Sequence, residues 1–221
     1  EQTVRVLPKG APLASPLRTD PSVRERWNDY GIGLLQQGDL RNAEAAFLHV
    51  MASEPGYADG PLNVARVRLQ EGDLEGGEAM LRTSLTIDGS LARTHYFLGT
   101  ALKGLGRYEE ALTHLEKTIA LYPKDRVALN QFGRVLFLQR EFDRAIAVFR
   151  RVLAIDPEDL QAHYNLMLCY QGTGREELAS KEEQLFLRFK ADEGSQAIAG
   201  DFSRTSPEDN NERQNIHEHG R

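Results

Sequence analysis

The sequence predicts an all-α fold, a right-handed α-solenoid of about five helix pairs with extended N- and C-terminal arms. One observation is apolar spacing: in residues 106–123, apolar side chains recur mostly every three or four positions, which places them on one helix face. Another is Pro123, which ends that helix because proline has no N–H to donate. The third is a turn signal that recurs every 34 residues, at Gly38, Gly72, Gly106, Arg140 and Gly174. A fixed period of this length predicts stacked repeats that bury their apolar faces against one another.

Composition and charge exclude several classes of protein. The formal net charge is −6, whereas a general nucleic-acid binder needs a basic face. Cys169 is the one cysteine, so neither an internal disulfide framework nor a cysteine-based metal site is available. Because Cys169 lies in the helical run HYNLMLCY, we expect a buried small side chain there rather than a reactive thiol. No apolar run approaches the roughly 18 residues of a membrane-spanning helix.

Residues 1–23 form an extended, proline-rich N-terminal arm. Its prolines exclude a continuous helix: Pro8, Pro12, Pro16 and Pro21. Residues 3–7 alternate in polarity, which suits an extended strand. Two interpretations stay open: the arm packs on the first helices of its own chain, or it docks on a neighbouring molecule.

The repeats occupy residues 24–191, in units near 24–57, 58–91, 92–125, 126–159 and 160–191. Each unit is expected to be two antiparallel helices joined at a turn signal. Small side chains let the helices approach closely: Gly31, Gly99, Gly133, Ala43, Gly77, Ala111, Ala145 and Ala179. In the last unit we expect Glu182 and Glu183 to give a polar, capping face. Residues 192–221 are predicted to be a polar C-terminal tail with a composition typical of disorder.

The units share one pattern of bulky and small residues, which is clearest in the first and the fourth: Trp27, Tyr30, Gly31, Leu34, Ala43, Phe47 and Pro55; Leu129, Phe132, Gly133, Leu136, Ala145, Phe149 and Pro157. This spacing resembles the tetratricopeptide repeat, W-x2-L-G-x2-Y…A-x3-F…P. The second unit departs from it at Pro61, Gly77 and Gly89, and the fifth at Glu183 and Ala191. The resemblance covers the whole array.

The resemblance implies that the first helix of each unit lines a concave groove that holds an extended peptide or another protein. By repeat phase, the groove residues are Asn28, Ile32, Leu35, Leu62, Asn63, Arg66, Leu69, Arg93, Tyr96, Thr100, Lys103, Asn130, Arg134, Phe137, Tyr164 and Leu168. Amides can bond a peptide backbone, cations can pair with carboxylates and rings provide contact area. The alternative is a merely solvated surface.

The subfamily that clamps a C-terminal carboxylate uses a set of Lys, Asn and Arg residues over three consecutive units. Asn63 and Arg93 lie near such places, but Ile32 and Phe97 stand at others. We therefore do not expect a clamp of that type.

No catalytic constellation is evident. His95 and His163 occupy the same repeat position, which favours a structural role, and no HExxH, Walker, CxxCH or GxSxG motif occurs. His217 and His219 could ligate a metal, but two histidines in a tail do not make a site. We predict no enzyme, no cofactor and no metal.

The arms carry a second resemblance. The VRVLP segment and the PEDN-x-ERQ-x-IH-x-H pattern of the tail are similar to repeat regions appended to bacterial multihaem c-type cytochromes. This resemblance implies an extracytoplasmic protein, in the periplasm or at the cell surface, beside a multihaem segment or partner that carries any haem. Because the sequence begins at Glu1 rather than methionine, we also expect a processed or excised chain.

These observations favour a non-catalytic scaffold that binds a partner protein or peptide in the groove. The alternative is a structural subunit whose terminal arms join neighbours in a homo-oligomer or filament. The acidic tail could then lie along the cationic side of a groove, its own or a neighbour's. The third class, an enzyme, is disfavoured by the missing motifs.

Overall fold

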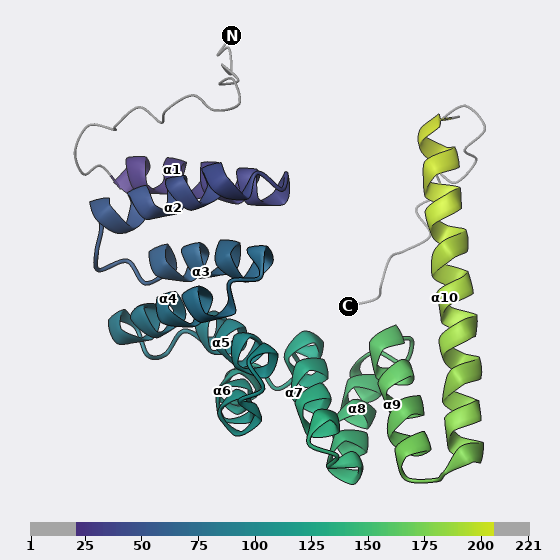
Figure 1. Cartoon of the computed structure of the whole chain (residues 1–221). Coiled ribbons are helices and arrows are strands. Elements are labelled where there is room, and N and C mark those ends of the chain that lie inside the picture. Colours follow the sequence, from purple (N-terminus) through teal and green to yellow (C-terminus); the bar gives the residue numbers. More distant parts are fainter. Residues whose placement is uncertain (1–20, 206–221) are drawn as a thin grey trace, which may run out of the picture. The chain divides into compact units, whose positions relative to one another are not determined.

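Ten α-helices and no strand make up the part of the chain that the structure describes (Figure 1). The structure is a computed structural model that describes the backbone of residues 21–205 and the side chains of residues 23–191. The all-α solenoid fold is thereby confirmed. The predictions for residues 1–20 and 206–221, including the strand at residues 3–7 and the arm contacts, lie outside the described residues.

The chain divides into two compact units, Glu1–Val135 and Leu136–Arg221. The helices of the first unit follow one another in pairs: α1 (Pro21–Gln36) and α2 (Leu40–Ser53), α3 (Asp59–Glu71) and α4 (Leu74–Ile87), α5 (Ala92–Gly104) and α6 (Tyr108–Leu121). The two helices of each pair pack on each other, α2 packs on α3, and α4 packs on α5. The next helix, α7 (Arg126–Leu138), begins in this unit and ends in the second.

The second unit contains α8 (Phe142–Ile155), α9 (Leu160–Gly172) and α10 (Glu176–Thr205). α9 packs on both α8 and α10. The predicted array boundary at residue 191 falls inside α10, which continues to Thr205. No proline occurs between Pro157 and Pro207, so the sequence contains no strong helix breaker at that boundary.

The turns inside the pairs need a left-handed backbone conformation. Gly106 has a φ of 75°, and a Cβ atom added there would meet nothing within 4 Å. Arg140 occupies the equivalent turn between α7 and α8 with a φ of 61°, and it is the non-glycine residue with positive φ among the described residues. A side chain in this conformation costs roughly 1 kcal/mol relative to glycine.

Arg140→Gly is therefore expected to raise the free energy of unfolding by about 0.5–1 kcal/mol. The gain is reduced because glycine also adds freedom to the unfolded chain. Gly106→Ala is the reciprocal change and should lower stability by about 1 kcal/mol, since nothing but φ opposes the methyl group. Urea unfolding followed by circular dichroism measures both, and equal midpoints for Arg140→Gly and the parent would contradict the strain at this turn.

Small residues set the spacing within the pairs, as the sequence predicts. A Cβ atom at Gly31 would lie 2.6 Å from the Phe47 ring, and one at Gly99 would lie 2.7 Å from Cγ of Leu115. Ala111 is fully buried on α6. Its carbonyl oxygen would lie 3.1 Å from a Cβ atom added at Gly99. Contacts this close leave no room for a side chain at Gly31 or Gly99.

Hydroxyl groups of Ser84, Thr94 and Thr118 lie in the core of the first unit. Ser84 and Thr118 occupy the repeat position at which the first pair has Val50, and all three are buried. The Ser84 hydroxyl donates to the carbonyl oxygen of Ala58 over 2.8 Å, and that of Thr118 donates to Ala92 over 3.2 Å. Each bond joins the end of a second helix to the start of the first helix in its own pair. A buried hydroxyl with a partner is tolerated where an unpaired one would be costly.

Candidate functional site

Four of the residues assigned to the groove are buried, and the others are half-buried or exposed. Leu35 and Leu62 are buried, with 7% and 2% of their surface exposed. Leu35 packs in a cluster with Phe47 and Val64, so neither leucine is available to a partner. Asn63 and Asn130 are also buried. The other groove residues remain half-buried or exposed: Asn28, Ile32, Arg66, Leu69, Arg93, Tyr96, Thr100, Lys103, Arg134, Phe137, Tyr164 and Leu168.

An amide link joins α1 to α3. The Asn63 side-chain amide donates to Oδ1 of Asn28 over 2.8 Å, and its own Oδ1 accepts from Nη1 of Arg66 over 2.9 Å. The Arg66 guanidinium lies 5.7 Å from the centre of the Phe97 ring on α5. Burial, together with the like charge of Arg93, lowers the pKa of Arg66. Asn63 thus holds a half-buried cation in place rather than facing a partner itself.

A second cation lies further along α5. Nζ of Lys103 donates to Oε1 of Gln131 on α7 over 2.5 Å. Burial and the neighbouring charge of Arg134 lower the pKa of Lys103. At the other end of α5, Nη2 of Arg93 lies 2.9 Å from Oδ1 of Asp59.

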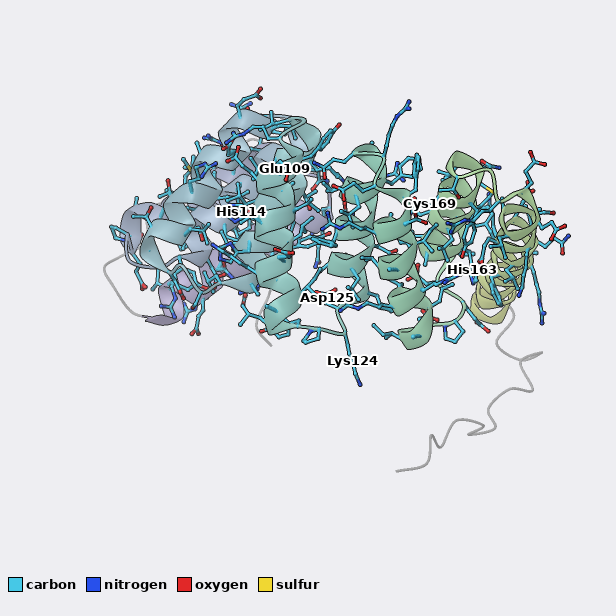
Figure 2. The ribbon with its side chains drawn as sticks, turned by 90° about the horizontal axis from the view of Figure 1, so that it is seen from below. Glu109, His114, Lys124, Asp125, His163 and Cys169 are labelled. Carbon is cyan, nitrogen blue, oxygen red and sulfur yellow. The ribbon has the colours of Figure 1, made fainter. Side chains whose placement is uncertain are left out.

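A small pocket opens beside the start of α5. Its volume is about 190 Å³, and its lining is Ala92, Arg93, Tyr96, Thr118, Tyr122, Asp125 and Val127. Oδ1 of Asp125 accepts from the backbone N–H groups of Val127 and Ala128, at 2.9 and 3.1 Å, and so caps α7. Figure 2 labels Asp125 at this turn, next to Lys124, whose side chain points away from the ribbon. Burial, with a smaller effect of Asp125, raises the pKa of the Tyr96 phenol.

The assignment of groove residues by repeat position included Arg93 and Tyr96. It did not include the residues on the other side of this pocket. Tyr122, Asp125 and Val127 belong to the connection between α6 and α7 and to the first turn of α7. The exposed fractions of Tyr122 and Val127 are 58% and 57%. The sequence signal was an aromatic residue directly before Pro123, at a position where the repeat pattern specifies no aromatic residue.

The second unit presents an aromatic surface between α9 and α10. The rings of Tyr164 and Phe186 lie 5.5 Å apart, and Nζ of Lys190 lies 5.6 Å from the centre of the Phe186 ring. Tyr164 and Leu187 are 40% and 56% exposed. Tyr164 therefore keeps the accessibility that the groove assignment requires.

His163 and His95 have structural roles, as their shared repeat position predicts. Nε2 of each ring lies near the carbonyl oxygen of the preceding loop, 2.9 Å from Pro157 and 3.1 Å from Gly89. Nδ1 of His163, which Figure 2 labels, lies 2.6 Å from Oε2 of Glu182 on α10. Glu182 is therefore half-buried against a histidine, whereas Glu183, the other residue assigned to the polar capping face, is exposed. Shielding by the His163 ring explains the difference.

His95 instead faces a second histidine. Its Nδ1 lies 2.9 Å from Nδ1 of His114 on α6. Since Nε2–H of His95 donates to the carbonyl oxygen of Gly89, Nδ1 of the neutral His95 ring carries no proton and accepts from Nδ1–H of His114. Burial lowers the pKa of both, and the pKa of His114 falls to about 4, with His95, Lys117 and Arg82 adding to the effect and Glu110 opposing it.

Cys169 is fully buried on α9, as expected for a small core residue. Burial raises the pKa of its thiol to about 12, so the reactive thiolate form is suppressed. Within residues 23–191, no group of three His, Cys, Asp or Glu side chains is arranged to hold a metal ion. None of the helices described here is long and apolar enough to cross a membrane.

Comparisons with known proteins give one consistent result. Two family models described as tetratricopeptide repeat match residues 90–158 and 136–182. The solved structure of MamA is 22% identical, with a TM-score of 0.68, and the match covers 79% of this chain and 95% of that one. YrrB, described as a TPR protein with an unusual peptide-binding site, is 22% identical with a TM-score of 0.64, over 79% of this chain and 90% of that chain.

A curated relative also matches. Superkiller protein 3 of Schizosaccharomyces pombe is 22% identical over 174 residues, which is 76% of this chain and 12% of the relative. The chain therefore spans about an eighth of the length of that relative.

Proposed function

We propose that this chain, which is a tetratricopeptide repeat protein, is a non-catalytic scaffold that binds an extended segment of a partner protein on the first helices of its repeats. The observation that carries the proposal is the surface of α3, α5 and the start of α7. There, cations and amides lie half-buried around an aromatic ring and a pocket. YrrB, which shares the fold, is described as having a peptide-binding site.

The chemistry of this surface suits a polypeptide. Thr100, Gln131 and Asn28 provide polar groups for backbone bonding, and Tyr96 and Phe97 meet edge to face at 5.2 Å, which provides rigid contact area. The pocket volume of about 190 Å³ is below the roughly 300–1,000 Å³ typical of small-molecule sites. The pocket therefore suits one side chain of a partner better than a whole cofactor.

Site-specific photocrosslinking in cells tests this proposal. A benzoylphenylalanine residue replaces Arg93 on α5 or Tyr164 on α9, both exposed on first helices. The controls replace Thr113 on α6 or Ala147 on α8, which are exposed on second helices. We expect crosslinked adducts from the first pair of positions and few from the second. Equal yields from both pairs would contradict a binding surface on the first helices.

The extracytoplasmic setting and the association with a multihaem cytochrome stay proposals, because they depend on the arm sequences. The assembly of neighbouring chains through these arms is likewise a proposal. Comparing the mass distribution of the full chain with that of chains lacking residues 1–21 or 201–221 tests assembly. Unchanged mass distributions at low and high salt would eliminate the arms as assembly elements.

A further inference from the structure

We propose that the first-helix surface of the first unit selects an acidic segment: Arg66 and Lys103 each receive a carboxylate of the partner, and a large apolar side chain of the same segment enters the pocket beside Tyr96. The inference rests on the proposed function, which supplies the surface, and it adds the chemistry of the occupant.

Arg66 and Lys103 differ from several other cations of the first unit because neither forms an ion pair within the described residues. Elsewhere in that unit a guanidinium usually contacts a carboxylate: Arg24 with Glu54, Arg68 with Glu44, Arg93 with Asp59, and Arg107 with Glu78. Arg66 and Lys103 contact only the side-chain oxygens of Asn63 and Gln131 and, for Arg66, an aromatic ring, as far as the described residues extend. Neither half-buried cation forms an ion pair within the described residues, and Asp59, whose charge acts on Arg66, is already paired with Arg93.

An uncompensated charge that is half-removed from water is costly. The lowered pKa values of Arg66 and Lys103 have this burial as their first cause. A carboxylate that approached either group would gain a charge-assisted hydrogen bond without disrupting an existing ion pair. The amide oxygens of Asn63 and Gln131 already fix the two cations, so little side-chain freedom is lost when a partner binds.

The sign of the charge on this surface is opposite to that of the whole chain. The chain has a formal net charge of −6, yet its groove residues include Arg66, Arg93, Lys103 and Arg134 on α3, α5 and α7. The nearby carboxylates already have other partners, because Asp59 pairs with Arg93 and Asp125 accepts from backbone N–H groups at the start of α7. Charge complementarity therefore favours an acidic occupant and disfavours a basic one.

The pocket supplies the second element of recognition. It is lined mainly by apolar atoms of Ala92, Tyr96, Tyr122 and Val127, with the Arg93 side chain also in its lining. An apolar side chain from a partner would bury area there while an adjacent carboxylate remains close to the cations. Combining one anchored side chain with flanking charges gives both affinity and selectivity.

Fluorescence anisotropy with synthetic peptides tests the inference on the full chain. The probes are three labelled pools of twelve-residue peptides that place one Phe among random Asp and Glu, among random Asn and Gln, or among random Lys and Arg. We expect the acidic pool to bind at least ten-fold more tightly than the amide pool, and the basic pool not to bind. An acidic pool with Ala in place of Phe should bind several-fold more weakly than its parent pool.

The double variant Arg66→Gln, Lys103→Gln is expected to lose at least ten-fold of the affinity for the acidic pool and most of its salt dependence. The matched control is Arg41→Gln, Lys117→Gln, which removes the same charge from exposed positions on α2 and α6 and should bind like the parent. Circular dichroism spectra confirm that each variant is folded.

The outcomes separate the two proposals. Equal binding of the acidic and amide pools, binding of no pool, or equal losses in the two double variants would overturn the selection of acidic segments. The general scaffold proposal would survive any of these results if photocrosslinks still form at Arg93 and not at Thr113. If the crosslinks too are unselective, the scaffold proposal itself fails.

Discussion

Ala111→Trp is expected to lower the free energy of unfolding of the first unit by about 3 kcal/mol or more. Ala111 is fully buried on α6, and its carbonyl oxygen lies 3.1 Å from where a Cβ atom of Gly99 would be. An indole at this position must separate α5 from α6, because a close-packed interior cannot absorb the added volume. Urea unfolding monitored by circular dichroism gives the change in free energy directly.

Ala120→Trp is the matched control. Ala120 belongs to the same helix but is exposed, so the same substitution should change stability by no more than about 0.5 kcal/mol. If Ala111→Trp and Ala120→Trp unfold at the same urea concentration, the close contact between α5 and α6 is incorrect.

Acidification from pH 6.5 towards pH 4 is expected to destabilise the chain through His95 and His114. An unfolded histidine has a pKa near 6.5, whereas burial holds that of folded His114 at about 4. The folded state therefore resists protonation. The stability from the neutral pair is fully present above about pH 6.5 and is lost as the pH falls through this window, by on the order of 2 kcal/mol.

The loss of stability on acidification is electrostatic. A proton on either ring adds a charge to this half-buried pair beside Lys117. Once both rings are protonated, two Nδ1–H groups 2.9 Å apart face each other without an acceptor. Unfolding free energies of the parent and of His114→Gln are to be measured at pH 7.5, 6.5, 5.5 and 4.5. The variant should show the shallower pH dependence, since carboxylates that titrate near pH 4 affect both proteins alike. Parallel profiles would refute the contribution of the pair.

The fold could be predicted from the sequence because the same turn residues and small contact residues recur at the same positions of the repeats. Gly106 and Arg140 mark turns whose backbone has positive φ, and Gly99 and Ala111 mark the close approach of two helices. These requirements act over a few residues and recur in phase, so sequence spacing alone reveals them.

The candidate site could be predicted from the sequence only in part. Repeat phase gives the direction of a side chain around its helix, but it does not say how far the neighbouring helix covers that side chain. Leu35 and Leu62 point from first helices and are nevertheless buried. The pocket wall at Tyr122 and Val127 depends on the path of a connection between pairs, which the repeat pattern does not specify. The partner of His163, Glu182, was missed because that contact joins residues 19 positions apart on different helices.

The packing of consecutive helices on one another from α1 to α6 has a kinetic consequence. In the first unit, extensive contacts join consecutive helices, and α3 with α5 is a non-consecutive pair that makes far fewer. Contacts of this kind join residues that are close in sequence, so little chain entropy is lost before native packing begins to compensate for it. Folding of this unit should therefore be fast, on the millisecond scale or below, and any helix pair with one neighbour can serve as its nucleus.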